Sequence, residues 1–252
     1  AKAYWKKHKR QGVTIYSAEK KMRERNYYAA MMVNEGDADA LITGYSRNYP
    51  SVVKPMLELI GMANGISRVA TTNIMMTQRG PMFFSDTSIN IDPNAKDLAK
   101  IARMTYRVAK MFGIEPVTAM ISYSNFGSSD NPRAEKVRDA VAYLHKAYPE
   151  MIVDGELQTD FALNSKMLQD IFPFSKLAGK KVNTLVFPSL DSANITYKLL
   201  KELNKAESIG PIMMGMAKPV HILQLGASVD EIVNMTAISV IDAQQREKRQ
   251  QK

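Results

Sequence analysis

The sequence predicts an α/β protein in which mostly parallel β-sheets are covered by helices on both faces, in three layers. From residue 117 to 203, apolar strand-like runs alternate with helical segments, which is the pattern of repeated βα units. Two earlier strand candidates, 70–77 and 82–87, flank Gln78-Arg-Gly-Pro81, a turn sequence that predicts a hairpin and an antiparallel edge. The length of 252 residues favours two domains.

The remaining elements follow from apolar periodicity and from capping residues. Ser17 is the expected cap of a helix that ends at Gly36, and Asp92-Pro93 is expected to open a helix that ends near Gly113. Either Asp191 or Ser192 is the expected cap of the helix that follows Pro188. The other predicted segments are a basic helix over 2–12, strands at 37–44, 117–123, 151–155, 184–190 and 209–216, and helices at 51–60, 134–148, 161–171, 195–203 and 229–245.

One stretch, Lys218 to Asn234, combines a strand-like run with a glycine turn and an immediate helix start. Gly226 can adopt a positive φ, and Ser228 with Glu231 forms the pattern of a capping box. Plain helix initiation explains these residues. The N–H groups at such a helix start can also bind a phosphorylated ligand, so an anion site is the second interpretation.

The composition argues against several function classes. The net charge of +9 comes from the two ends, because residues 1–25 hold nine Lys and Arg against two acids, and residues 246–252 hold four against one. The body between them is nearly neutral, which does not favour nucleic acid, although a basic binding or scaffold module is one hypothesis that charge alone suggests. With no cysteine, three scattered histidines, no long apolar run and no signal peptide, we expect a cytoplasmic protein without a metal site or a membrane span.

The loop from Ser122 to Pro132 is the most informative candidate site. Ligands of parallel sheets bind beyond the carboxyl ends of the strands, and this loop combines hydroxyl groups, a glycine and a helix start. These features suit a phosphate or pyrophosphate cradle. An Asx or Ser turn that caps the next helix explains them equally well.

Three carboxylates lie within seven residues in Asp154-Gly-Glu-Leu-Gln-Thr-Asp160. Such a group can perform acid–base chemistry or hold a metal ion, but hydrogen bonding to loop N–H groups is the favoured interpretation. The chain has no Ser-His-Asp order, P-loop or Gly-x-Gly-x-x-Gly motif.

Several motifs, in order and spacing, resemble the phosphate acetyltransferase family. They are Ser122-Tyr-Ser, Asp154-Gly-Glu-Leu-Gln, Phe187-Pro-Ser-Leu-Asp, Asn194-Ile, Gly210-Pro-Ile and Ala217-Lys-Pro-Val. A further set is more similar to the version fused C-terminally to NADP-dependent malic enzymes: Tyr4-Trp5 with Gly12-Val-Thr14, Asp86-Thr with Asp92-Pro93, Ser124-Asn-Phe-Gly-Ser-Ser129, Leu190-Asp-Ser-Ala-Asn194 and Pro219-Val-His-Ile-Leu223.

The resemblance implies that the catalytic residues are degenerate here. Active family members place a Ser-Arg pair before a glycine and an acid five residues beyond it, and the corresponding positions are Gln224, Leu225 and Glu231. The family's arginine before a proline becomes Lys54. Because Leu225 cannot bind phosphate and Gln224 carries no charge, transfer activity is not expected. The implied acetyl-CoA or phosphate-binding candidates are Lys54, Ser122, Ser124, Asn125, Gly127, Ser128, Asn194, Lys218 and Gln224.

The resemblance also implies a role and an architecture. The expected role is a regulatory domain that binds acetyl-CoA or CoA as an effector and supports a homodimer or higher oligomer, with no cofactor of its own. NADP and a divalent metal would belong to an N-terminal malic enzyme domain absent from this sequence. The expected lobes are 1–64 with 207–252, incomplete at its N-terminus, and 65–206, with the ligand cleft between them. The alternative is an active phosphate acetyltransferase, for which Glu231 would be the base.

Overall fold

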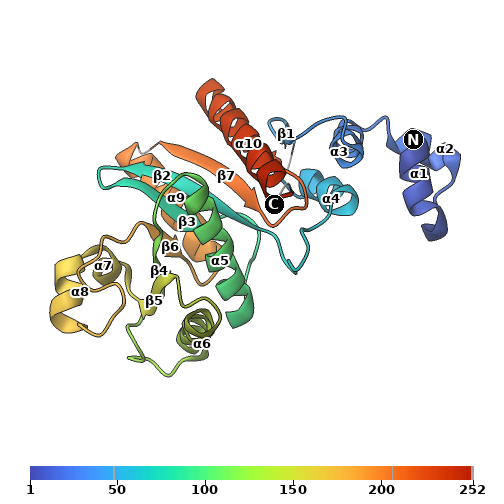
Figure 1. The fold of residues 1–252 in the computed structure, drawn as a ribbon. Helices are drawn as coiled ribbons and strands as arrows, with labels where there is room; N and C mark the ends of the chain where they lie inside the picture. Colours follow the sequence, from blue (N-terminus) through green and yellow to red (C-terminus); the bar gives the residue numbers. More distant parts are fainter. Residues whose placement is uncertain (48, 206, 251–252) are drawn as a thin grey trace. The chain divides into compact units, whose positions relative to one another are not determined.

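The strands that the structure describes form two separate sheets, one in each of two units (Figure 1). The computed structural model describes residues 1–47, 49–205 and 207–250. The central unit is Arg68–Met214, and the terminal unit combines Ala1–Ser67 with Gly215–Lys252. The last two residues of the basic segment predicted over 246–252 lie outside the described residues.

The central unit contains a six-stranded sheet with the order β5-β4-β6-β3-β2-β7. Its strands are β2 (Ala70–Thr77), β3 (Gly80–Ser85), β4 (Val117–Ile121), β5 (Ile152–Leu157), β6 (Thr184–Val186) and β7 (Ser208–Met214). The ladders from β3 through β6 and β4 to β5 are parallel, whereas β2 is antiparallel to both β3 and β7. The predicted α/β class with a mostly parallel sheet and an antiparallel hairpin is therefore confirmed.

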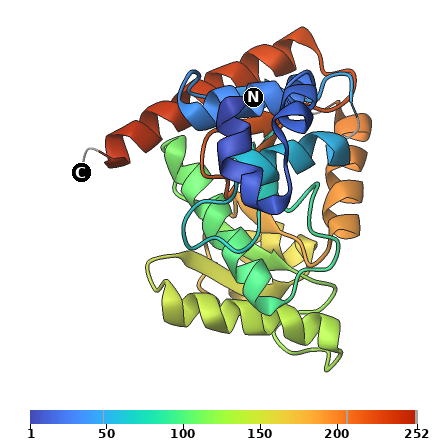
Figure 2. The same ribbon diagram turned by 90° about the vertical axis from the view of Figure 1, so that its right-hand side faces the viewer.

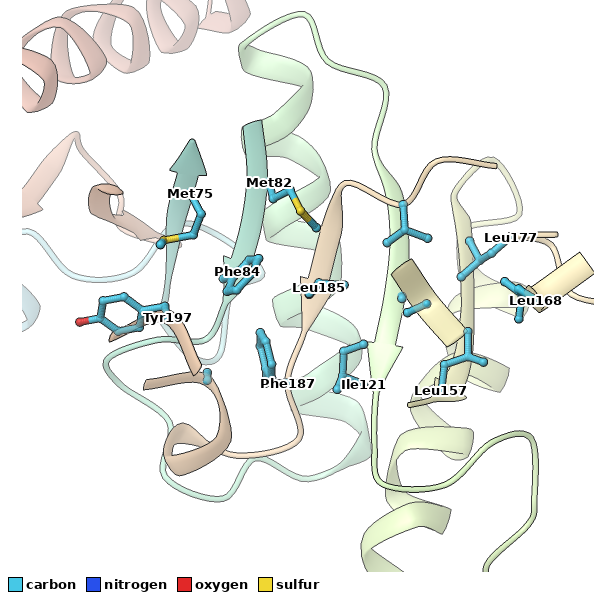
Figure 3. Packing of buried hydrophobic residues seen from close by; sticks show 14 residues of the cluster. Met75, Met82, Phe84, Ile121, Leu157, Leu168, Leu177, Leu185, Phe187 and Tyr197 are labelled. Atoms are coloured by element: carbon cyan, nitrogen blue, oxygen red, sulfur yellow. The ribbon is translucent and has the colours of Figure 1, made fainter. Parts of the chain in front are cut away.

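Helices cover both faces of this sheet. Helices α5 (Ala95–Met111) and α6 (Pro132–Ala147) lie side by side in Figure 2 and contact β3, β4 and β5. Helices α7 (Thr159–Leu163), α8 (Ser165–Ile171) and α9 (Leu190–Asn204) bury one apolar cluster against alternate residues of the strands. Figure 3 shows this cluster, from Met75 and Phe84 to Leu157 and Leu168. Burial of these side chains supplies most of the driving force for the unit.

Several predicted helix starts were wrong by a few residues. Asn94, not Asp92, caps α5, because Asp92 is drawn to Lys136 in an ion pair of 2.5 Å. Ser189 caps α9 in place of Asp191 or Ser192. The helix predicted over 161–171 is two helices, because the Asn164 side chain accepts from the N–H of Met167 and restarts the chain as α8.

The terminal unit has a two-stranded parallel sheet of β1 (Leu41–Thr43) and β8 (Val220–Ile222). Helices α3 (Arg25–Glu35), α4 (Tyr49–Leu59) and α10 (Val229–Gln250) pack against these strands. The N-terminal helices are α1 (Lys2–His8), the 3₁₀ turn Lys9–Gln11 and α2 (Ile15–Lys21). The sheet of the terminal unit is therefore small, with three paired positions between its two strands.

The helix predicted from Ser17 to Gly36 is also divided in two. Thr14 caps α2, and Ser17 is its reciprocal partner at the third helical position, so the two hydroxyl residues form a capping box. Helix α3 then starts at Arg25 and ends where Gly36 adopts a left-handed conformation, as predicted.

The basic helix α1 is joined to α4 within the terminal unit by partly buried polar contacts. The hydroxyls of Tyr4 and Tyr27 donate to Glu58 on α4, and the Lys7 ammonium donates to the Leu59 carbonyl at 2.7 Å. Burial and the bond to Glu58 raise the pKa of Tyr4 to about 12. Partial burial opposes ionisation of Glu58, but the hydrogen bonds from Tyr27 and Tyr4 outweigh it and lower its pKa. This part of the basic segment is a packed structural element.

The boundary between the units differs from the predicted one. The segment 208–214 was expected to return to the first lobe, but as β7 it pairs antiparallel with β2. The central unit therefore ends at Met214, and Gly215 begins the return to the terminal unit. Over the described ranges, no helix is both long and apolar enough to cross a membrane.

Gly44 provides a test of the terminal unit. Its φ is +110°, and a Cβ there would lie 2.5 Å from the Leu223 carbonyl oxygen. We expect Gly44→Ala to lower the free energy of unfolding by about 3 kcal/mol, from left-handed strain plus a backbone clash. Gly12→Ala is the control, because Gly12 has a positive φ but open space around it, and should cost only about 1 kcal/mol. Urea unfolding followed by Trp5 fluorescence reports this unit, and equal losses would contradict the clash.

Candidate functional site

The carboxyl ends of β4 and β5 carry a buried ionic site in the central unit. The side chain of Glu156 is fully buried, and its Oε1 accepts hydrogen bonds from Ser124 Oγ at 2.7 Å, the Gly127 N–H at 2.9 Å and Arg138 Nη1 at 2.9 Å. The same Arg138 nitrogen donates to the Ser129 carbonyl. The predicted anion cradle thus surrounds an anion that belongs to the protein itself.

The contacts of Glu156 are concentrated on one oxygen. Its Oε2 is buried and makes no hydrogen bond with any described residue. A buried carboxylate is stable only when charge and hydrogen bonds compensate it, so the three donors to Oε1 must do this for the whole group. Removing any one of them therefore affects a charge that water cannot reach.

The other candidates in this loop form an ordered turn. The amide of Asn125 pairs with Gln158 in both directions, since its Oδ1 accepts from the Gln158 N–H and its Nδ2 donates to Gln158 Oε1, each at 2.8 Å. Ser128 Oγ accepts from the Asn125 N–H at 3.0 Å, and Ser122 is buried with its N–H bonded to the Leu157 carbonyl. These contacts support the turn interpretation, although Ser128 and Gly127 are exposed at the surface.

Phe126 fixes the conformation of the loop. It has a positive φ of 44°, which is unusual for a residue with a side chain, and its ring packs against Phe172 and Phe174 at centroid distances of 5.0 and 4.9 Å. Sequence reasoning missed both this aromatic cluster and Arg138. Phe126 was visible in the loop motif, but no local signal linked it to residues 46 and 48 positions later.

A second buried carboxylate organises the loop after β3. Asp86 Oδ1 accepts from the Thr71 N–H, the Thr71 hydroxyl and the Ser88 N–H, and its Oδ2 accepts from the N–H and the side-chain amide of Asn90. The candidate Asn194 joins this network by donating to the Thr87 carbonyl at 2.9 Å. Asn194 is therefore a structural contact between α9 and this loop.

The carboxylates of the segment 154–160 lie in β5 and at the start of α7, and the two buried ones have structural contacts as well. Asp154 Oδ2 accepts from the Ser175 hydroxyl at 2.9 Å and the Lys176 N–H at 2.8 Å. With Glu156 held by Arg138, both buried carboxylates of the cluster have protein donors, which supports the favoured structural interpretation. Across the described part of the chain, no group of three His, Asp or Glu residues could hold a metal ion.

In the terminal unit, the stretch after β8 adopts the predicted turn and capping box. The Ser228 N–H donates to Glu231 Oε2 at 2.8 Å, and the Glu231 N–H donates to Ser228 Oγ at 3.1 Å. Leu225 is 61% exposed at the start of this turn. The loop after β1 lies beside it, because the Gly226 N–H donates to the Tyr45 carbonyl at 3.5 Å.

The candidates Lys218 and Gln224 lie at opposite ends of β8. Lys218 precedes the strand and lines a hollow of about 610 Å³ together with Asp39 and residues of α10, whereas Gln224 follows the strand at its carboxyl end. Six extended residues span roughly 20 Å, so one small ligand group cannot contact both side chains. Lys54 is exposed on α4.

Comparison with known proteins identifies the family of this chain. Residues 1–240 match the phosphate acetyl/butaryl transferase family. The chain belongs to this family. A phosphotransacetylase from Streptococcus pyogenes has a similar structure, with a TM-score of 0.85 and 37% identity over 95% of this chain and 72% of that chain.

Two kinds of curated relatives resemble this family member about equally. An NADP-dependent malic enzyme from Escherichia coli is 38% identical over 96% of this chain but only 33% of its own length. A phosphate acetyltransferase from Clostridium acetobutylicum is 36% identical over 97% of this chain and 75% of its own length. The chain thus spans about a third of the malic enzymes that it matches.

The Glu156 site of this family member can be tested by removing its donors. Arg138→Ala should lower the free energy of unfolding by about 3 kcal/mol, because it leaves a buried carboxylate without its cation, and Ser124→Ala by about 2 kcal/mol. Arg133→Ala, an exposed arginine of the same helix, should change it by less than about 0.5 kcal/mol. Urea unfolding followed by circular dichroism measures all three, and equal effects of the two arginine variants would remove Glu156 from the argument.

His221 in β8 predicts an acid sensitivity of the terminal unit. Burial lowers the pKa of this histidine to about 4, with Asp242 opposing and Arg246 assisting the shift. Because the pKa of His221 is lower in the folded protein, its contribution to the free energy of unfolding is fully present above the unfolded-state pKa of about 6.5. This contribution is lost as the pH falls toward 4. The loss should reach about 3 kcal/mol at most.

The measurement is urea unfolding of the terminal unit by Trp5 fluorescence between pH 7 and pH 4. His221→Gln should flatten the decline, whereas His145→Gln, which changes a half-exposed histidine of the central unit, should retain it. An unchanged pH profile in His221→Gln would contradict the assignment.

Proposed function

We propose that this chain is a regulatory domain that binds acetyl-CoA or CoA and does not transfer acetyl groups. The observation that carries the proposal is the pair Gln224-Leu225 at the carboxyl end of β8, where the family resemblance places a Ser-Arg pair. A transfer site must stabilise the charge that develops on phosphate and on the leaving thiolate. An exposed leucine contributes nothing to that task.

The state of Glu231 supports the same proposal. A general base must present a free oxygen to the proton that it removes. Here Oε2 of Glu231 accepts the Ser228 N–H in the capping box, and helix initiation thus accounts for this carboxylate. The capping box gives this acid a structural role, so its presence is not by itself an argument for catalysis.

The proposed context is a longer polypeptide. The malic enzymes that this chain resembles extend well beyond the matched third, so we place an N-terminal malic enzyme domain, with NADP and a divalent metal, in the same cytoplasmic polypeptide. Acetyl-CoA binding would then lower the rate of malate oxidation by that domain. Oligomerisation through the central unit is part of the same proposal.

An active phosphate acetyltransferase is the second candidate function. It is favoured by relatives of that name at 35–36% identity, three of which share at least 71% of their own length with this chain. In that case Gln224 and Leu225 would be tolerated substitutions, and a different residue would supply the cation.

Calorimetric titration with acetyl-CoA, together with an assay for phosphate-dependent release of the CoA thiol, separates the two. We expect binding without turnover. Lys54→Ala should weaken the binding about tenfold, which corresponds to about 1.4 kcal/mol, because an ammonium–phosphate contact is lost. Lys198→Ala, which removes an exposed cation of α9, should have no effect.

A gain-of-function variant strengthens the test. Gln224→Ser with Leu225→Arg restores the pair that the resemblance predicts for a transferase, and acetyl phosphate formation should rise above background. Turnover by the unmodified chain at a rate that this variant does not increase would overturn the regulatory proposal and establish the transferase.

A further inference from the structure

A hollow of about 530 Å³ opens into the central unit beside the β2–β3 turn. Its apolar lining comes from Met75, Met82 and Phe84 of the hairpin strands and from Leu163 and Leu200 of α7 and α9. Figure 3 shows Met75, Met82 and Phe84 close together on the face of the sheet that these helices cover. The volume lies within the range of small-molecule sites, roughly 300–1,000 Å³.

The position of the hollow separates it from the loops already described. Strand β3 begins at Gly80, and β3 is parallel to β6 and β4, so the β2–β3 turn lies at the amino edge of the parallel strands. Ser122 and Glu156 lie at the carboxyl ends of β4 and β5, which is the opposite edge. A ligand in the hollow would leave the Glu156 site untouched.

The chemistry of the lining suits a flexible apolar chain. Three of the lining residues are methionines, whose unbranched thioethers adapt to ligands of varied shape. Met76 is 41% exposed and Leu163 and Leu200 are partly exposed, whereas Met75, Met82 and Phe84 are buried in the core and offer a ligand almost no surface. Apolar atoms that face an open hollow lack contacts on one side, and a hydrocarbon chain would supply them.

The charged groups of the lining favour an anion. Arg79 and Lys205 both line the hollow and are exposed, and neither side chain makes a hydrogen bond or ion pair with another described residue. Among the described lining residues, Glu207 is the only acid. Arginine recognises carboxylates through a planar pair of N–H groups, and an apolar floor beneath two cations matches an amphipathic anion.

We propose that this hollow binds a medium-chain aliphatic carboxylate, with the hydrocarbon chain against Met76, Leu163 and Leu200 and the carboxylate at Arg79 and Lys205. The site is independent of the proposed acetyl-CoA function, because it uses a different edge of the sheet and a different ligand class. It makes the central unit responsive to free carboxylic acids.

The test uses octanoate and the protein with its methionines labelled by ¹³C at the methyl groups. Octanoate should shift the methyl resonance of Met76, with smaller shifts at the neighbouring Met75 and Met82, and leave that of Met56, which is buried in the terminal unit, unchanged. Octylammonium, with the same chain and the opposite charge, should not produce these shifts. Equal shifts with octylammonium would contradict the role of the two cations.

Variants at the surface of the hollow complete the test, because the buried floor cannot be changed without affecting folding. Arg79→Glu with Lys205→Glu should weaken octanoate binding at least tenfold, and Met76→Trp should block it. Lys198→Glu, a charge reversal on the exposed surface of α9, is the matched control and should bind octanoate like the unmodified protein. No octanoate binding, or binding that survives both lining variants, would overturn the proposal.

Discussion

The carboxylate of Asp86 connects β2 to the loop after β3 in the central unit. Its five hydrogen-bond donors come from β2 and from the loop after β3, and Thr87 extends the network to Asn73, which reaches Ser208 of β7. An ionised group removed from water is tolerated only when its lone pairs are satisfied, so each donor must hold its position for the charge to stay buried. The antiparallel strands and the loop that leads into α5 therefore depend on one side chain.

Periodicity and composition predicted the elements well where a segment is long and apolar. Strand β2 was predicted with its observed bounds, and the alternation of strands and helices led to the parallel sheet. The helix caps were harder, because several polar residues compete within a few positions. Asn94 rather than Asp92 caps α5, since distant Lys136 binds Asp92, and no local pattern contains that contact.

The candidate site shows the same limit more strongly. The sequence pointed to the loop after β4 and left a cradle and a polar turn as equal interpretations, and it located the capping box of Ser228 and Glu231. It could not predict that Ser124 and Gly127 donate to Glu156, because that contact depends on β4 and β5 being neighbours. Lys218 and Gln224 were also predicted to bind the same ligand, whereas they lie at opposite ends of β8.

The carboxylate of Glu156 has a consequence for any phosphate that approaches its loop. This group is an anion tethered inside the nest of N–H and O–H donors, and an intramolecular partner competes at an effective concentration far above that of a solute. A phosphate that entered the nest would also leave a negative charge buried beside it. The inner donors of the loop are therefore already bonded to Glu156, whereas Ser128 lies exposed at its surface.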